Sequence, residues 1–400
     1  MAFQKTFIPY GGYWSSPFAR WQGSFASLHA LKLAGDVTRK ALEARNLSPK
    51  TFSNVYLGMT IPALQSFYGA PWLAGMIGAE GVTGPVFSQA CATSARVIGS
   101  AAQTVETGSS DSILCITADR TSNGPHLLYP NPLGPGGRGD AEDWVWDNFN
   151  RDPFAGNSMI QTAENVAKEA VIATAEQHEV VLMRYAQYQK ALENDAAFHK
   201  LYMTPVEVNP SGKKVIATVT DDEGVFPSTT EGLAKLKPIM PEGTVTFGGQ
   251  TFPADGNAGM VVTTREKARE LSKDSKIEIQ LLSFNEGRTA KGFMPKANLP
   301  AVRGALAQSG VDLKDIKAIK THNPFAVNDI FLSRELGVGL DKMNNYGSSL
   351  IWGHPQGPTG MRLIIELIEE LVLLGGGYGL FTGCAAGDTA AAIVLEVRAS

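Results

Sequence analysis

The stretch from Ala92 to about Glu106 constrains the fold more than any other part of the chain, because it predicts a helix unusually rich in small residues. Small side chains let a helix pack closely against other backbone, so we expect this helix in the interior of the protein. The apolar segment "GPVFSQ" before it and "SILCITA" after the "GSSD" turn both predict short buried strands. Together they predict one βαβ unit.

A similar order of elements returns near the C-terminus. "DIKAIKTHNPFAVNDIFLSREL" predicts a strand, a turn and a helix, and a helix from about Met361 to Leu374 follows the Gly/Pro loop "GHPQGPTG". "LFTG" and "AAAIVLEV" then predict two further strands. The matching order, rather than any sequence identity between the halves, predicts a duplicated α/β fold.

Between the halves, residues 121–247 differ in composition, with a Gly/Pro-rich stretch followed by segments that predict helices. We expect an inserted, partly helical subdomain there. "FPADGNAGMVVTTREKAREL" then predicts a strand and a helix that return to the first half. The predicted organisation is therefore a first half from residues 1–120 and 248–272, an inserted loop domain over 121–247, and a second half over 273–400.

Composition excludes several classes of protein. With 400 residues the chain can bury a large core, and its net charge of -4 without any Lys/Arg run argues against nucleic acid as a partner. The first residues lack the apolar region of a secretory signal, and "LIIELIEELVLLGGGYG" carries glutamates that favour an amphipathic helix over a membrane span. Three cysteines do not suggest a disulfide framework, so we expect a reducing cytoplasm and no membrane partner.

Cys91 stands in "FSQACATSA", between a predicted strand and the small-residue helix. The unpaired N–H groups and the dipole of a helix N-terminus stabilise negative charge, which predicts a lowered pKa and a nucleophilic thiolate. A buried structural cysteine is the alternative interpretation, and position alone does not separate the two. Cys115 lies inside an apolar strand, where we favour the structural interpretation.

Three other residues extend this candidate site. His354 in the Gly/Pro loop has little apolar cover and is suited to take a proton from a nearby thiol, although it also fits a loop histidine that caps a backbone group. His322 follows a predicted strand and Cys384 precedes a small-residue turn, and each is ambiguous alone. As a set, they occupy the strand ends and loops where α/β folds locate active sites.

No spacing of cysteines and histidines matches a zinc site, and no glycine pattern matches a P-loop or a dinucleotide fingerprint. The sequence therefore predicts no metal and no bound cofactor.

At this point the chain resembles the thiolase family. The segment "SQACATSARVIGSAAQTVETGSSD" resembles the nucleophile segment of the family, and "NSMIQTAENVA" resembles a stretch of its inserted loop domain. The segment "ADGNAGMVV" resembles a strand of the family. The segment "NNYGSSLIWGHPQGPTGMR" resembles its histidine loop, and "FTGCAAGDTAAAIVLE" resembles its final block. These matches run in the family's order from about residue 80 to the C-terminus. The resemblance implies the thiolase fold, a duplicated five-layered αβαβα architecture with an inserted loop domain over the coenzyme A (CoA) site.

The resemblance also implies roles. Cys91 would attack an acyl or β-keto thioester, His354 would activate that thiol and help hold the thioester oxygen, and Cys384 would move the proton at the α-carbon of the second substrate. In "HNPF", His322 stands where many thiolases have an asparagine that positions a water. A histidine there resembles HDAF-type thiolases and condensing ketosynthases, and it implies direct binding of an oxygen.

Further contacts follow from the same resemblance. The backbone N–H groups of Cys91 and Ala386 would bind the oxyanion, although Ala386 replaces a glycine of the family pattern, so its backbone must avoid positive φ. Phe325 and Met159 would contact the substrate. CoA and acyl-CoA are expected as substrates rather than as cofactors, and a homodimer or higher oligomer is the expected assembly.

The N-terminal "YWSSPFARWQGSFASLHALKLAGD" resembles a divergent branch that includes subunits acting on 2-benzoylsuccinyl-CoA. This resemblance implies an aromatic acyl group, a role in aromatic degradation and a small zinc-containing OB-fold partner. Several aromatic residues fit such an acyl group, although core or dimer packing is the favoured interpretation; they are Tyr129, Trp144, Trp146, Phe149 and Trp352, with Tyr13, Trp14 and Trp21 near the N-terminus.

Two other functions stay open. A ketosynthase-like condensing enzyme would use one cysteine and two histidines, and the second cysteine, Cys384, argues for a thiolase instead. A non-catalytic scaffold or lipid-carrier subunit has no need of a paired acid and base, so the presence of all four candidate residues argues against it.

Overall fold

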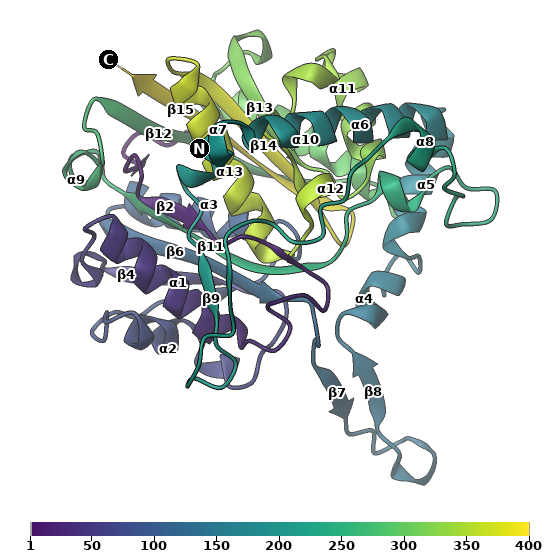
Figure 1. Cartoon of the computed structure of the whole chain (residues 1–400), viewed down its shortest axis with the longest axis horizontal. Coiled ribbons are helices and arrows are strands. Elements are labelled where there is room, and N and C mark those ends of the chain that lie inside the picture. The colour runs from purple at the N-terminus through teal and green to yellow at the C-terminus, as the bar shows by residue number, and fades with distance from the viewer. Residues whose placement is uncertain (1, 400) are drawn as a thin grey trace.

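The computed structural model describes residues 2–399, and in this range the chain forms one mixed sheet of eleven strands with helices on both faces and between its halves (Figure 1). The strands follow the order β13-β14-β15-β12-β1-β11-β6-β4-β5, and β2 and β3 also pair with β11. The strands are β1 (Phe7–Ile8), β2 (Tyr13–Ser15), β3 (Ala19–Arg20), β4 (Asn54–Gly58), β5 (Val86–Phe87), β6 (Ser112–Arg120), β11 (Ala254–Thr263), β12 (Ile277–Arg288), β13 (Ile316–His322), β14 (Gly377–Ala385) and β15 (Thr389–Ala399).

The helices and two separate hairpins complete the described chain. The helices are α1 (Ala30–Ala44), α2 (Gly69–Met76), α3 (Thr93–Glu106), α4 (Trp146–Asn150), α5 (Met159–Glu169), α6 (Thr174–Ala191), α7 (Glu193–Lys200), α8 (Thr230–Leu233), α9 (Arg265–Leu271), α10 (Asn298–Ser309), α11 (Ala326–Leu336), α12 (Ser349–Trp352) and α13 (Gly357–Leu373). The hairpins pair β7 (His126–Tyr129) with β8 (Asp140–Asp143) and β9 (Val206–Val208) with β10 (Ala217–Val219).

The two halves of the sheet repeat one pairing pattern. In the first half β4 is parallel to β6, which is antiparallel to β11, and in the second half β13 is parallel to β14, which is antiparallel to β15. The short strand β1 joins them, because Phe7 pairs with Thr263 of β11 on one side and with Gln280 of β12 on the other. The predicted duplication of the α/β fold is therefore confirmed.

Helices divide this sheet into layers. α3 and α13 pack against each other and contact strands of both halves, whereas α1 and α2 cover the first half and α10 covers the second (Figure 1). The order is thus helix, sheet, helix, sheet, helix, and the predicted five-layered architecture is confirmed. The predicted strand "GPVFSQ" is shorter than expected, since only Val86 and Phe87 form β5.

The small-residue helix lies in the central layer, as its composition predicts. Most of α3 is buried, and its Gly99 packs on the ring of Phe284 from β12. A Cβ atom at position 99 would lie 2.5 Å from that ring, so a larger residue would push the second half of the sheet away.

The amphipathic helix predicted here has no solvent-exposed face, because the glutamates of α13 are buried. This helix is buried from Gly357 to Leu371, glutamates included, because partners within the helix and on a neighbouring strand neutralise its charges. Glu366 pairs with Arg362, and Glu370 with the buried Lys320. No helix within residues 2–399 has the length and apolar character needed to cross a bilayer.

The segment between the two parts of the first half carries α4–α8 and both hairpins, and the β7–β8 hairpin projects away from the body of the protein (Figure 1). The predicted boundaries fall at the end of β6 and shortly before β11, and the division into domains stays a prediction. A fully buried ion pair joins this segment to the second half: Arg184 Nε of α6 lies 2.9 Å from Asp329 Oδ2 of α11.

We predict that Asp329→Asn destabilises the fold, because it leaves the Arg184 guanidinium buried without its counter-charge, at a cost of about 3–5 kcal/mol. Thermal unfolding followed by circular dichroism should show a midpoint several degrees below that of the wild type. Asp36→Asn is the matched control, since its ion pair with Arg39 on α1 is exposed and contributes about 0–1 kcal/mol. Equal midpoints for the two variants would contradict a stabilising role for the buried ion pair between Arg184 and Asp329.

Candidate active site

Cys91 lies on a tight turn between β5 and the N-terminus of α3, where it is half-buried. The residue before it, Ala90, has φ of 44°, in the left-handed region that favours glycine, so the turn carries backbone strain. The Thr93 hydroxyl holds the turn, because it accepts the N–H of Gln89 at 2.8 Å and donates to the carbonyl of Ala90 at 2.7 Å.

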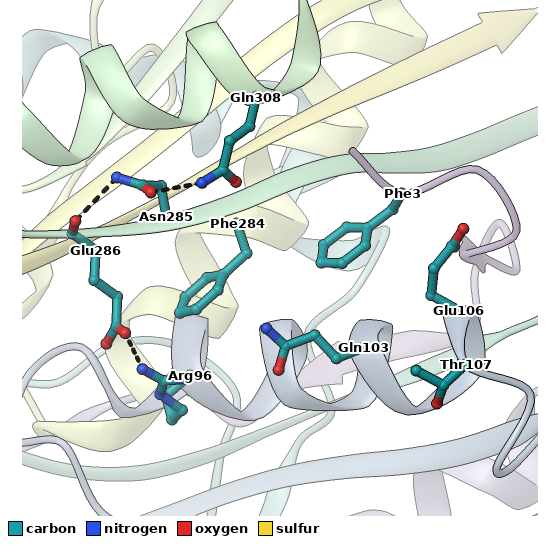
Figure 2. A pocket seen from close by; sticks show the side chains of 9 residues that line it. All are labelled: Phe3, Arg96, Gln103, Glu106, Thr107, Phe284, Asn285, Glu286 and Gln308. Atoms are coloured by element: carbon teal, nitrogen blue, oxygen red, sulfur yellow. Dashed lines mark hydrogen bonds and ion pairs between the residues drawn. The ribbon is translucent and has the colours of Figure 1, made fainter. Parts of the chain in front are cut away.

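A polar cluster fixes the same turn from the side of the second half. The Gln89 amide donates to Glu286 at 2.5 Å and accepts from Arg96 Nε at 2.8 Å, and Arg96 forms an ion pair with Glu286. Figure 2 shows this ion pair among the residues that line a hollow of about 400 Å³ between α3 and β12. None of the four predicted catalytic residues lines this hollow, so it is not the candidate active site.

The loop that carries His354 is docked on the first half of the sheet. The His354 N–H donates to the carbonyl of Phe252 at 2.9 Å. Asp119 at the end of β6 accepts the N–H of Gly357 at 2.8 Å and also binds the N–H groups of Thr60 and Ile61. A Cβ atom at Gly357 would lie 2.7 Å from the Asp119 carboxylate, so this approach requires glycine.

This docking brings His354 to Cys91. His354 Nε2 lies 3.2 Å from Cys91 Sγ, and His354 Nδ1 lies 2.6 Å from the Thr359 hydroxyl, which orients the ring. The backbone N–H groups of Ala386 and of Cys91 itself donate hydrogen bonds to the Cys91 sulfur. The arrangement has a nucleophile, a base within hydrogen-bond reach and two backbone donors, which is what acyl transfer requires.

The predicted low pKa of Cys91 is wrong. Burial raises the pKa of the Cys91 thiol, and it outweighs the hydrogen bonds from Ala386 and Cys91, which lower it. Burial likewise lowers the pKa of His354, although a hydrogen bond with Gln356 acts in the opposite direction. The Asp119 carboxylate raises the pKa of Cys91 further, so the resting pair is a neutral thiol and a neutral imidazole.

His322 lies directly against His354, with ring centroids 4.1 Å apart and the rings stacked. His322 Nδ1 lies 2.8 Å from Ser349 Oγ, and the Ser349 hydroxyl donates to Asn323 Oδ1. Because that hydroxyl has one proton, it accepts from His322, which assigns the proton of the neutral ring to Nδ1. Nε2 of His322 is buried without a hydrogen-bond partner.

The tautomer of His322 limits what this residue can do. Its Nε2 carries a lone pair and accepts a hydrogen bond, whereas binding of an oxyanion needs a donor. Burial and the neighbouring His354 both lower the pKa of His322, so the ring stays neutral. A substrate O–H or S–H group, or a water, fits this lone pair, and the implied contact with a substrate oxygen stays a prediction.

Cys384 completes the cluster from β14. Its side chain is fully buried and accepts a hydrogen bond from Asn328 Nδ2 of α11 at 3.1 Å. Burial raises the pKa of Cys384, and the nearby Cys91 sulfur raises it further. The structure thus brings Cys91, His322, His354 and Cys384 together from distant parts of the chain, while their catalytic roles stay predictions.

The three predicted substrate contacts are less tightly defined. Ala386 is exposed beside the Cys91 sulfur and avoids positive φ, as its β-carbon requires. Phe325 is buried at the N-terminus of α11, and Met159 is half-buried at the start of α5. No contact joins Phe325 or Met159 to the Cys91 sulfur among the described hydrogen bonds and ring pairs, so their contact with substrate stays a prediction.

Ligand atoms of Cys91, His322 and His354 lie within 4.8 Å of one another. One thiol and two imidazoles are ligands that Zn²⁺ accepts, so the same atoms that suit nucleophilic catalysis also suit a soft metal ion. The predicted absence of a metal stays a prediction.

Several residues of the site were not predicted from the sequence. Gln356 and Thr359 lie in the His354 loop, Ser349 orients His322, and Asn328 binds Cys384. Each is a polar residue within six positions of a predicted catalytic residue, which is the only signal that the sequence offers for them. Asp119 had no such signal, because it stands at the end of an apolar strand.

Comparisons with known proteins identify the family of the chain. The family model "Thiolase, N-terminal domain" matches residues 14–266, and "Thiolase, C-terminal domain" matches residues 276–397. The chain belongs to the thiolase family. Among its relatives, the mitochondrial 3-ketoacyl-CoA thiolase of Homo sapiens is 29% identical over 395 residues, with 96% of each chain covered.

Other thiolases are similar to the same extent. The acetyl-CoA acetyltransferase of Escherichia coli (strain K12) is 29% identical over 389 residues, which cover 94% of this chain and 95% of that protein. The crystal structure of human mitochondrial 3-ketoacyl-CoA thiolase in complex with CoA matches 99% of both chains with a TM-score of 0.89 and 25% identity. The thiolase fold predicted from the sequence is confirmed, and these relatives support an acyltransferase.

We predict that alkylation of Cys91 by iodoacetamide has no plateau near neutral pH. Burial raises the pKa of this thiol, so the thiolate fraction and the rate should keep rising through the ordinary thiol pKa of about 8.5. Peptide mass spectrometry across a pH series gives the rate at Cys91 alone. A thiolate–imidazolium pair in the resting enzyme, with a thiol pKa of about 3–4, would instead give a flat, fast rate from pH 6 to pH 8.

Proposed function

We propose that this chain catalyses CoA-dependent cleavage of a β-keto acyl-CoA, or the reverse Claisen condensation, through an acyl group carried on Cys91. The observation that supports it most is the 3.2 Å contact between Cys91 Sγ and His354 Nε2, with backbone N–H groups directed at the same sulfur. The names of the relatives, which include acetyl-CoA acetyltransferases and 3-ketoacyl-CoA thiolases, support this reaction class.

In the first half of the reaction the Cys91 thiol gives its proton to His354 Nε2 as its sulfur attacks the β-keto carbon. The carbonyl oxygen becomes an oxyanion, which the N–H groups of Cys91 and Ala386 can bind. The carbon–carbon bond then breaks, its electron pair leaves on the α-carbon of the departing acyl-CoA, and the Cys384 thiol supplies a proton to that carbon. The acyl-enzyme then has a His354 imidazolium and a Cys384 thiolate.

In the second half the CoA thiol attacks the acyl carbon and gives its proton to the Cys384 thiolate. The Cys91 sulfur leaves and takes its proton back from His354. Both cysteines and the imidazole thus return to their starting states. Run in reverse, Cys384 removes the α-proton of an acyl-CoA, which then attacks the acyl group on Cys91.

A hollow of about 380 Å³ on the side of the inserted segment supports the binding of CoA through its contact with the catalytic loop, since none of the four predicted catalytic residues lines it directly. Its apolar wall includes Phe226, Leu233, Phe247, Phe252 and Leu350. The backbone carbonyl of Phe252 is also the acceptor for the N–H of His354, so this hollow shares a wall with the catalytic loop. An apolar channel of this kind suits the pantetheine arm and the acyl chain.

The finer features of the substrate stay predictions. Trp352 is fully buried against Phe18 and the Arg362 guanidinium, which supports core packing, and Trp146 packs edge-to-face against Trp21 at the surface. Neither contact favours an aromatic acyl group such as 2-benzoylsuccinyl-CoA. The zinc-containing OB-fold partner, the oligomeric state and the cytoplasmic location also stay predictions.

A ketosynthase-like condensation is the second candidate, because one cysteine and two stacked histidines share the site. Cys384 beside Cys91 favours the thiolase, since it supplies a second acid and base. Acyl transfer from CoA thioesters but not from acyl carrier protein would support the thiolase, whereas the opposite preference would support the ketosynthase. Absence of both activities would support a scaffold.

We predict that Cys91→Ser lowers thiolytic turnover by about 10³-fold or more, because a serine hydroxyl beside a neutral histidine is a far weaker nucleophile than a thiol. Turnover is measured as loss of the magnesium-enolate absorbance of β-keto acyl-CoAs on addition of CoA. Cys115→Ala is the matched control, since Cys115 is buried in β6 outside the site, and it should keep wild-type turnover. Equal turnover by Cys91→Ser and wild type would remove Cys91 from the mechanism.

We also predict that Cys384→Ala separates the two chemical steps. Acyl transfer from an acyl-CoA to Cys91 should fall far less than carbon–carbon bond formation, because CoA can leave as a thiolate without the proton that Cys384 supplies. Formation of the carbon–carbon bond should be lost, because no group removes the α-proton. A variant that fails to acylate Cys91 at all would contradict this division of roles.

A further inference from the structure

Gln356 contacts both members of the nucleophile–base pair. Its side chain is 6% exposed, and its Oε1 atom lies 3.2 Å from Cys91 Sγ as the acceptor of the thiol proton. The same side chain forms a hydrogen bond with His354, which acts to raise the pKa of that histidine. The Gln356 amide oxygen can therefore accept a hydrogen bond from the proton both when Cys91 carries it and when His354 carries it.

The backbone of Gln356 indicates that its side chain is held there at a cost. Its φ of 63° and ψ of -105° are close to the mirror image of extended backbone, a conformation that glycine adopts without strain and other residues avoid. Pro355 precedes it and the tightly docked Gly357 follows, so the loop allows little relaxation. A glycine would fit this backbone better, yet the chain has a long polar residue.

The two hydrogen bonds of Gln356 differ in strength. A thiol is a weak donor, whereas the N–H of an imidazolium is a charged and strong one. The amide oxygen therefore stabilises the state with the proton on His354 more than the state with the proton on Cys91. Since burial disfavours the charged state of both residues, this contact opposes the effect of burial.

We propose that Gln356 is a positioning residue that holds the proton on His354 after Cys91 has been deprotonated. This inference rests on the proposed function. In the acyl-enzyme the Cys91 sulfur is part of a thioester and accepts hydrogen bonds poorly, so the Nε2–H of His354 has Gln356 Oε1 as its acceptor. The proton is retained there until Cys91 leaves the acyl group and takes it back.

The test is the pH profile of Cys91 alkylation in the full-length protein. Gln356→Met keeps the length of the side chain but removes the acceptor, so the rate at pH 8 should fall by about tenfold and the profile should shift to higher pH. Gln356→Glu keeps an oxygen acceptor for the imidazolium and should retain more of the rate than Gln356→Met. Gln308→Met, on α10 and outside the site, is the matched control and should leave the profile unchanged.

The Gln356→Gly variant distinguishes the effect of losing the side-chain acceptor from the effect of backbone strain at this position. Glycine relieves the positive φ, so this variant should unfold at a higher temperature than the wild type while losing alkylation rate as Gln356→Met does. A Gln356→Met or Gln356→Gly profile equal to that of the wild type would overturn the proposal.

Alkylation needs no thioester, so its result is independent of the proposed reaction. Shifted profiles without any turnover of β-keto acyl-CoA would leave the Gln356 contact intact and remove the thiolase mechanism. Turnover with alkylation profiles equal to that of the wild type would support the thiolase mechanism and remove the proposed role of Gln356.

Discussion

The contact between the Cys91 sulfur and the His354 imidazole is the interaction on which the rest of the site depends. The two residues belong to different halves of the duplicated fold and meet because α3 and the His354 loop are both fixed to the first half of the sheet. Asp119 makes the decisive connection, since its carboxylate binds the Gly357 N–H of the loop and lies at the end of β6. Duplication provides the two halves, and this carboxylate brings their loops together.

Burial of this contact has a consequence for its chemistry. Because burial disfavours charge on both groups, charge separation between Cys91 and His354 is unfavourable at rest, so the thiol stays protonated. Charge then forms only when a thioester provides an oxyanion and backbone N–H groups bind it. The same arrangement protects the sulfur from reactions that need a preformed thiolate, such as oxidation.

The polar residues around the cluster keep its geometry without adding net charge. Thr359 and Ser349 each bind a histidine Nδ1, and Asn328 binds Cys384. Ser349 in turn is held by Asn323, which binds the buried Asp329 paired with Arg184. A chain of hydrogen bonds thus connects His322 to the inserted segment.

Much of the fold could be predicted from the sequence, because periodicity reports local structure and burial. The small-residue helix was correctly expected in the interior, and the repeated order of elements predicted the duplication. The glutamates of α13 misled the prediction, since their partners, such as Lys320, come from other layers that no local pattern reveals. For the same reason the pKa of Cys91 could not be predicted, because the helix N-terminus is visible in the sequence but the depth of burial is not.

The residues of the candidate site likewise fall into those that the sequence predicts and those that only the structure reveals. Cys91, His322, His354 and Cys384 have side chains whose chemistry marks them in any context. Gln356 is an ordinary amide in a Gly/Pro loop, and only its strained backbone and its distance from the Cys91 sulfur distinguish it.

The most direct test of this account is to identify the atom that carries the acyl group. The protein is incubated with an acyl-CoA in the absence of an acceptor, quenched in acid and digested, and the peptides are examined by mass spectrometry. The account predicts one acyl group on the peptide that contains Cys91 and none on those that contain Cys115 or Cys384. An acyl group on another residue, or turnover without any acylated Cys91, would contradict it.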